Sequence, residues 1–248
     1  DVALLLSAMA GPDARSPISI REPGSRFAAS LERDFKGVRV AWSPDLGGLP
    51  VDPRVTAVLE SRRHVFEDLG CVLEEAAPDF EGADEAFKAW RAWHYAKTWG
   101  ALLQTHREQL KDTVIWNVEA GLELTGPQLG QAEVKRTRLY HRVRAFFENY
   151  EYLICPVNQV PPFDVKTRWV REINGVPMET YIDWMRSCYY ITVTGHPAIS
   201  VPCGFTPDGL PVGVQIVGRH EQDFAVLQLA HAFEGATQAG GRRPPVAM

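Results

Sequence analysis

Serine is the residue type in this chain with the clearest chemical potential, because an activated serine hydroxyl is a common covalent nucleophile. Nine serines are present, at positions 7, 16, 19, 25, 30, 43, 61, 187 and 200. None is the central residue of Gly-x-Ser-x-Gly, the sharp turn that exposes a hydrolase nucleophile, and none is flanked by another serine or by a Gly-Gly pair. Ser200 stands inside a predicted apolar strand, where we expect a hydrogen-bonded structural hydroxyl. No serine is therefore assigned a catalytic role.

Metal and phosphate chemistry also lack a recognisable motif. The closest histidine pairs, His94 with His106 and His220 with His231, are too widely spaced for a zinc-binding His-Glu-x-x-His helix. The four cysteines form no Cys-x-x-Cys pair, and we expect them to be buried free thiols. The Gly-Gly pair at 47–48 lacks the continuation of a phosphate-binding loop. The sequence therefore predicts neither a bound metal nor a cofactor.

Three further segments are candidates for binding. Residues 91–99, RAWHYAKTW, place aromatics at the helical spacing typical of a core, yet the interleaved basic side chains also allow a pocket wall. In residues 181–190, Asp183 and Arg186 are three apart, and we expect them to pair on the surface. Residues 156–159 directly follow a predicted strand, which is where α/β sheets bind ligands. A basic run over 135–144 is a candidate for an anionic partner, although a solvated helix face is favoured.

Length and composition limit the classes of protein that this chain can represent. It has 248 residues, 45% of them hydrophobic and 23% charged, which is ordinary for a globular protein. The formal net charge of -5 argues against a nucleic-acid partner. No apolar run approaches the ~20 residues of a membrane-spanning helix, so no membrane association is expected. The apolar start lacks the basic region of a signal peptide, which together with the expected free thiols predicts a cytoplasmic location.

Hydrophobic periodicity and turn signals predict the elements that position these residues. A helix over residues 1–10 ends at Gly-Pro, and Asp52-Pro53 starts another that we expect to run to Leu69 between strands at 38–42 and 71–75. Helices are predicted within 84–125 and over 131–149, 179–193 and 221–234, with a strand at 152–155. Asp208-Gly209 predicts a hairpin of strands 198–204 and 212–217. The sequence thus predicts an α/β fold, with a mixed β-sheet flanked by helices in a single domain that ends in a tail over 235–248.

The hairpin also shows a resemblance to a known family. Residues 195–218, GHPAISVPCGFTPDGLPVGVQIVG, closely resemble the C-terminal signature of the amidase signature family of serine hydrolases. Residues 37–80, with their Asp-Pro helix start, and residues 152–163, a strand followed by a Pro-containing loop, match further family segments in the same order. The resemblance implies the C-terminal part of the amidase signature fold, with the helix of residues 1–13 continuing from a missing preceding part.

The resemblance also defines what the chain lacks and what it supplies. The family uses a serine, a cis-serine and a lysine within a Gly-Gly-Ser-Ser-Gly-Gly-type motif, which has no counterpart here, so we carry over no catalytic residue. By position, the implied substrate-pocket residues are Asn158, Gln159, Trp184, Met185 and Tyr189. Members that act on glutamine place an acid near the position of Met185, and here the nearest acid is Asp183. We therefore expect an apolar or aromatic carboxamide substrate.

The functional expectation follows from this resemblance. The chain is interpreted as the scaffold and substrate-pocket portion of an amidase that hydrolyses a carboxamide to a carboxylate and ammonia or an amine. We expect it to be inactive alone and to need the missing N-terminal portion of the same protein as its partner. A homodimer is compatible with this expectation. The alternative is a stand-alone, degenerate family member that binds a ligand or a partner without catalysis.

Overall fold

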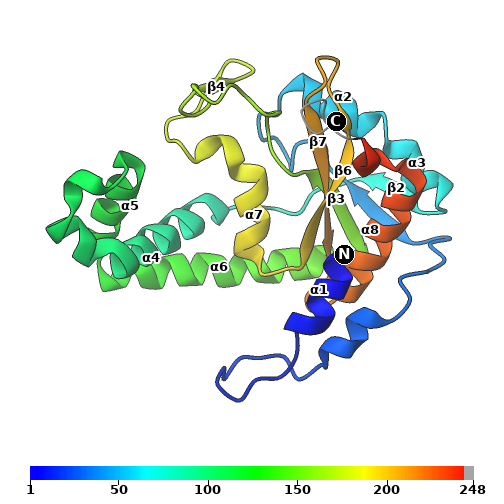
Figure 1. The fold of residues 1–248 in the computed structure, drawn as a ribbon, viewed down its shortest axis with the longest axis horizontal. Helices are drawn as coiled ribbons and strands as arrows, with labels where there is room; N and C mark the ends of the chain where they lie inside the picture. Colours follow the sequence, from blue (N-terminus) through cyan, green and yellow to red (C-terminus); the bar gives the residue numbers. More distant parts are fainter. Residues whose placement is uncertain (243–248) are drawn as a thin grey trace.

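The centre of the fold is a five-stranded sheet with strand order β2-β1-β3-β7-β6, seen in a computed structural model that describes residues 1–242 (Figure 1). Strand β1 pairs in parallel with β2 and β3, whereas β7 pairs antiparallel with β3 and β6. The sheet is therefore mixed, as predicted. Its strands are β1 (Arg39–Trp42), β2 (Val72–Glu75), β3 (Tyr152–Pro156), β6 (Ala198–Phe205) and β7 (Pro211–Gly218).

The predicted hairpin forms the β6 end of this sheet. Gly209 adopts a φ of +84°, a left-handed conformation that favours glycine, and the Thr206 N–H donates to the Leu210 carbonyl at 2.8 Å to close the turn. Among residues 1–242, strand β6 pairs only with β7, so no described strand covers its other edge. Ser200 lies exposed on this strand, so the expectation of a buried structural hydroxyl is wrong. The physical reason is that an edge strand of a sheet keeps one face and one edge in solvent.

Helices cover both faces of the sheet, as Figure 1 shows. Helices α2, α3 and α8 pack on one face and α4, α6 and α7 on the other. None of the described helices is long and apolar enough to cross a membrane. The helices are α1 (Val2–Met9), α2 (Pro53–Glu60), α3 (Arg63–Asp68), α4 (Ala83–Thr105), α5 (Asp112–Leu122), α6 (Gly126–Phe146), α7 (Arg186–Thr194) and α8 (Asp223–Thr237); short 3-10 turns cover Gly24–Ala28, Arg107–Gln109, Asp183–Met185 and Ala239–Gly241, and β4 (Glu172–Ile173) pairs with β5 (Val176–Pro177).

Several helix boundaries differ from the prediction. The helix that starts at Pro53 breaks at residues 61–62 into α2 and α3. Helix α6 begins five residues before the expected 131, because Thr125 and Gln128 form a reciprocal capping box. Helix α7 begins only at residue 186, after a 3-10 turn, and α8 extends to residue 237, past the expected start of the tail at 235. Residues 243–248 of that expected tail lie outside the described residues.

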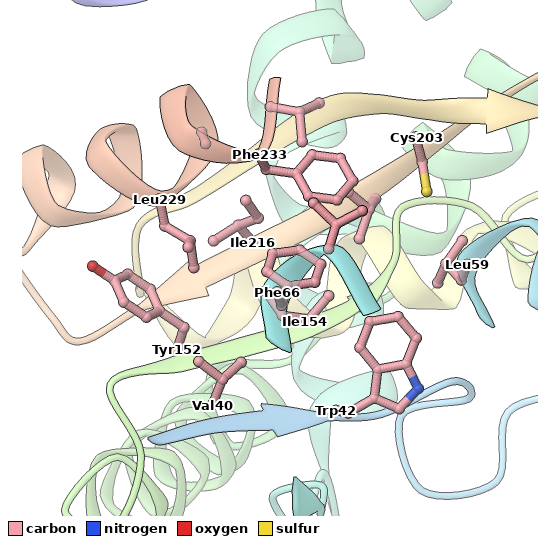
Figure 2. Packing of buried hydrophobic residues seen from close by; sticks show 14 of the residues in the cluster. Val40, Trp42, Leu59, Phe66, Tyr152, Ile154, Cys203, Ile216, Leu229 and Phe233 are labelled. Carbon is pink, nitrogen blue, oxygen red and sulfur yellow. The ribbon is translucent and has the colours of Figure 1, made fainter. Parts of the chain in front are cut away.

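The alternating strand pattern divides the core into two clusters. Val40, Trp42, Tyr152 and Ile154 face α2, α3 and α8, and in this layer Phe66 and Phe233 stack with ring centroids 4.7 Å apart (Figure 2). Ala41 and the intervening residues of β3 face α4, α6 and α7 instead. Successive strand residues point to opposite faces, so burial on both faces fixes the register of the central strands.

Candidate functional site

A cavity of about 180 Å³ lies at the carboxyl end of β3, formed by the loop that follows the strand. Asn158 and Phe163 of this loop line it together with Trp184, which stands just before α7. The rings of Phe163 and Trp184 meet edge to face with centroids 5.3 Å apart. The Trp184 Nε1–H is buried and has no hydrogen-bond partner among the described residues. The cavity therefore has aromatic walls, and one of the two aromatic side chains carries a buried donor without an acceptor.

Asn158 contributes an exposed amide at the rim of this cavity. Its Oδ1 accepts from the Cys188 Sγ at 3.2 Å, and the same thiol also lies 2.8 Å from the Val157 carbonyl. Cys188 is half-buried, unlike Cys71, Cys155 and Cys203, so the expectation of four buried thiols is correct for three of them. Burial raises the pKa of the Cys188 thiol, which keeps it protonated and able to donate.

Gln159, the next residue, links the loop after β3 to two neighbouring helices. It is fully buried, and its Nε2 donates to the Pro50 carbonyl at 2.9 Å while its Oε1 accepts from the Arg186 N–H at 2.6 Å. Its own carbonyl accepts from the Asp52 N–H at 2.7 Å. The side chain thus ties the loop after β3 to the start of α2 and to the start of α7. In this structure its amide is engaged by the backbone rather than turned into the cavity.

A cluster of charged side chains surrounds Asp183, the residue before Trp184. The carboxylate of Asp183 is only 1% exposed and accepts from the Lys88 Nζ at 2.9 Å, and the Arg186 guanidinium lies 3.2 Å from it. The predicted pair of Asp183 with Arg186 exists, but the expectation that it lies on the surface is wrong. Burial raises the pKa of Asp183, but hydrogen bonds from Lys88 and Thr180 outweigh it and leave this pKa below its usual range.

Tyr189 and Met185 lie on either side of the first turn of α7. Tyr189 is buried, its hydroxyl donates to Asp84, and its ring stacks on Phe87 with centroids 4.2 Å apart. Burial and the hydrogen bond to Asp84 raise the pKa of Tyr189, so this phenol stays neutral. Met185 is half-buried. Of the five sequence-predicted pocket residues, the structure brings Asn158 and Trp184 to one cavity, while Gln159 and Tyr189 hold neighbouring elements in place.

The ion pairs of Lys88 were not predicted from the sequence. Lys88 and Asp84 are four residues apart on α4 and pair at 2.8 Å, a spacing that is visible in the sequence. The contact of Lys88 with Asp183 spans 95 positions of chain and has no local signal. Within residues 1–242, no group of three or more His, Cys, Asp or Glu side chains could hold a metal ion.

The basic residues within 135–144 lie on α6, where several of them form surface ion pairs, as expected for a solvated helix face. Lys135 pairs with Glu85 at 3.3 Å, Arg142 with Asp79 at 3.2 Å and Arg144 with Glu148 at 2.9 Å. Opposite charges on neighbouring elements therefore offset much of this positive charge.

A mixed sheet flanked by helices defines an α/β protein, and its cavity lies at the carboxyl end of the central strand, where such proteins usually bind ligands. The model of the Amidase family matches residues 1–227, and the chain therefore belongs to the amidase signature family. Over 98% of its length it is 34% identical to an acylamidase from Rhodococcus erythropolis. Also over 98% of its length, it is 28% identical to a glutamyl-tRNA(Gln) amidotransferase chain from Listeria monocytogenes.

Solved structures share this fold. A bacterial aryl acylamidase of the same family superposes with a TM-score of 0.81 at 24% identity, covering 94% of this chain and 51% of its own. A 6-aminohexanoate cyclic dimer hydrolase gives a TM-score of 0.84 at 20% identity, covering 100% of this chain and 55% of its own. The chain also spans only 52% and 54% of the two curated relatives, which is about half of their length.

Proposed function

We propose that this chain is the C-terminal, scaffold and substrate-pocket portion of an amidase signature serine hydrolase. In this proposal the complete protein hydrolyses a carboxamide to a carboxylate and ammonia or an amine. The observation on which the proposal rests is a cavity at the carboxyl end of β3 in an amidase-family chain whose nine serines include no family nucleophile motif. The nucleophile and its activating lysine would come from a preceding segment, and this chain alone would be inactive.

The surface of the chain supports a partner segment. Helix α1 has no buried residue, and Val2, Leu4, Leu5 and Met9 are between 51% and 73% exposed. Strand β6 is an edge strand of the sheet, and no strand of residues 1–242 pairs with its outer side. Exposed apolar side chains and an edge strand of this kind are normally covered by another protein segment. The half-length match to the relatives supports the same proposal.

The walls of the cavity support an apolar or aromatic carboxamide as substrate. Phe163 and Trp184 present rings, and Met185 stands where members that use glutamine are expected to have an acid. Asp183, the nearest acid, is buried and already engaged by Lys88, so it is not free to bind a substrate amine.

The test compares benzamide with propionamide as substrates of the complete protein. Trp184→Ala removes an aromatic wall, so we expect kcat/KM for benzamide to fall about tenfold more than kcat/KM for propionamide. Trp99→Ala is the matched control, since Trp99 is 40% exposed on α4 and lines no part of this cavity. Hydrolysis of neither amide would contradict the proposed activity and favour a non-catalytic binding protein. An unchanged ratio in Trp184→Ala would contradict the pocket assignment alone.

We also propose a cytoplasmic location, supported by the four free cysteine thiols. A homodimer stays a prediction, to be checked by the mass of the native protein in solution.

A further inference from the structure

A second cavity of about 370 Å³ lies between α4, α6 and α7 and shares no residue with the Asn158–Trp184 cavity. Its walls are mainly aromatic, and its polar side chains include Arg91 and Arg136. The volume is within the range of small-molecule sites, about 300–1,000 Å³. Nothing in the proposed amide hydrolysis uses this cavity.

Arg91 is a half-buried cation that lacks a counter-charge. Its guanidinium forms no ion pair with any carboxylate of residues 1–242, and its Nη2 donates to the Tyr95 hydroxyl at 3.1 Å and the Tyr181 hydroxyl at 2.9 Å. The guanidinium carbon also lies 4.8 Å from the centre of the Tyr95 ring. These contacts fix the orientation of the side chain but leave its charge uncompensated. Such a cation is stabilised when an anion binds beside it.

Two buried donors at this cavity have no acceptor. The Arg91 Nε–H and the Trp90 Nε1–H are both buried, and neither has a hydrogen-bond partner among the described residues. Both residues line the cavity. Buried donors without an acceptor are rare in folded proteins, so this side of the cavity has a hydrogen-bonding requirement that no described side chain meets. A carboxylate has two acceptor oxygens and meets both the charge and the donor requirement.

The aromatic side chains that line the cavity indicate the chemistry of the remainder of the ligand. Trp90 and Trp93 meet edge to face with centroids 5.3 Å apart, and Phe87 and Tyr95 also line the cavity. Flat aromatic ligands gain stacking contacts against such walls. We propose that this cavity binds a monocyclic aromatic carboxylate, with its carboxylate beside the Arg91 guanidinium and its ring among the aromatic side chains. Binding does not require amide hydrolysis, so it holds or fails independently of the proposed function.

Benzoate titrated into the complete protein tests the proposal, with the indole N–H resonance of Trp90 as the readout. This resonance reports on the second cavity itself and is assigned by its loss in Trp90→Phe. We expect it to shift with a dissociation constant of about 1 mM or below, given the small size of the ligand. Benzyl alcohol, which has the ring without the charge, is expected to bind about tenfold more weakly or worse.

The Arg91→Gln variant is expected to weaken benzoate binding at least about tenfold. Arg138→Gln is the matched control, because Arg138 is exposed on α6 and lines no part of the cavity. Arg91→Lys keeps the charge but loses the Nε–H, and we expect an intermediate affinity, which also decides the matter should Arg91→Gln fail to fold. An unshifted Trp90 resonance at about 10 mM benzoate would overturn the proposal. So would benzoate affinity that is equal in the wild type and both Arg91 variants.

Discussion

The Nζ of Lys88 lies 2.9 Å from the buried Oδ1 of Asp183 and 2.8 Å from the Oδ2 of Asp84. This contact joins α4 to the segment that presents Trp184 to the cavity. Burial lowers the pKa of Lys88, but the hydrogen bonds to Asp84 and Asp183 outweigh it, and the net pKa is raised. Lys88 and Asp183 therefore stay charged across the neutral range, and their contact holds the segment that carries Trp184 against α4.

Replacing Lys88 with methionine removes the partner of a carboxylate that is almost fully buried. Asp183 keeps the Thr180 N–H at 2.6 Å and the Arg186 guanidinium at 3.2 Å, so part of the stabilisation survives. We expect the free energy of unfolding to fall by about 2–3 kcal/mol, measured by urea denaturation of the complete protein at neutral pH. Lys97→Met on the exposed side of α4 is the control and should change it by less than about 0.5 kcal/mol.

The pH dependence of this contact has a definite sign. The folded-state pKa of Asp183 is depressed, so its contribution to stability is present above the unfolded pKa of about 4 and is lost as pH falls through the folded value. The folded-state pKa of Lys88 is raised, so its contribution is lost only as pH rises above about 10.4. The destabilisation caused by Lys88→Met should therefore be constant from about pH 5 to 9. A destabilisation that vanishes within this range would contradict the assignment.

The burial of His196 predicts a separate loss of stability at mildly acid pH. The residue is 7% exposed and stacks on Phe147 with ring centroids 5.1 Å apart, and burial lowers its pKa to about 4. Because the unfolded histidine binds a proton at about pH 6.5, this contribution to stability is full above that pH and is lost as pH falls towards the folded pKa. We expect a loss of about 2 kcal/mol between pH 7 and pH 5, measured by urea denaturation.

The variant His196→Phe tests this account because it keeps an aromatic ring but has no proton to bind. Its stability should stay nearly flat between about pH 7 and pH 5, whereas His64→Phe, at an exposed position on α3, should follow the wild-type curve. A His196→Phe variant that loses stability as steeply as the wild type would assign the acid sensitivity to another group.

Gly121 permits the close crossing of α5 over α4. A Cβ at this position would lie 2.0 Å from the Ala92 carbonyl oxygen and 2.7 Å from the Ala96 Cβ. Gly121→Ala should therefore separate the helices and lower the free energy of unfolding by about 2–3 kcal/mol. Gly100→Ala on α4 meets nothing within 4 Å and should raise it by about 0.5–1 kcal/mol through helix propensity. Thermal unfolding of both variants distinguishes the two effects, and a neutral Gly121→Ala would contradict the close crossing.

Local signals in the sequence predicted most of the fold. The Asp52-Pro53 start of α2 is confirmed by the Asp52 side chain, which accepts from the Arg54 N–H, and the β6–β7 hairpin forms around Asp208-Gly209 as expected. The early start of α6 was also readable, because Thr125 and Gln128 have the spacing of a capping box. These features depend on residues a few positions apart, which is why a single sequence reveals them.

The arrangement of the site was less predictable because it depends on contacts between distant segments. The burial of Asp183 requires Lys88, 95 positions away, and the fixed amide of Gln159 requires Pro50, 109 positions away. Family resemblance pointed to the loop after β3 and to Trp184, and the structure places Asn158 and Trp184 at one cavity. No local pattern distinguishes a side chain that lines a cavity from one that supports its wall.

The central claim, that the amide-cleaving serine lies outside this chain, is tested most directly by labelling the complete protein with a fluorophosphonate. This reagent forms a serine–phosphorus bond and releases fluoride only at an activated hydroxyl. Peptide mass analysis then locates the labelled residue. We predict one labelled serine, outside residues 1–248, and loss of benzamide hydrolysis in step with labelling. A label on any of the nine serines of this chain, with the same loss of hydrolysis, would contradict the account.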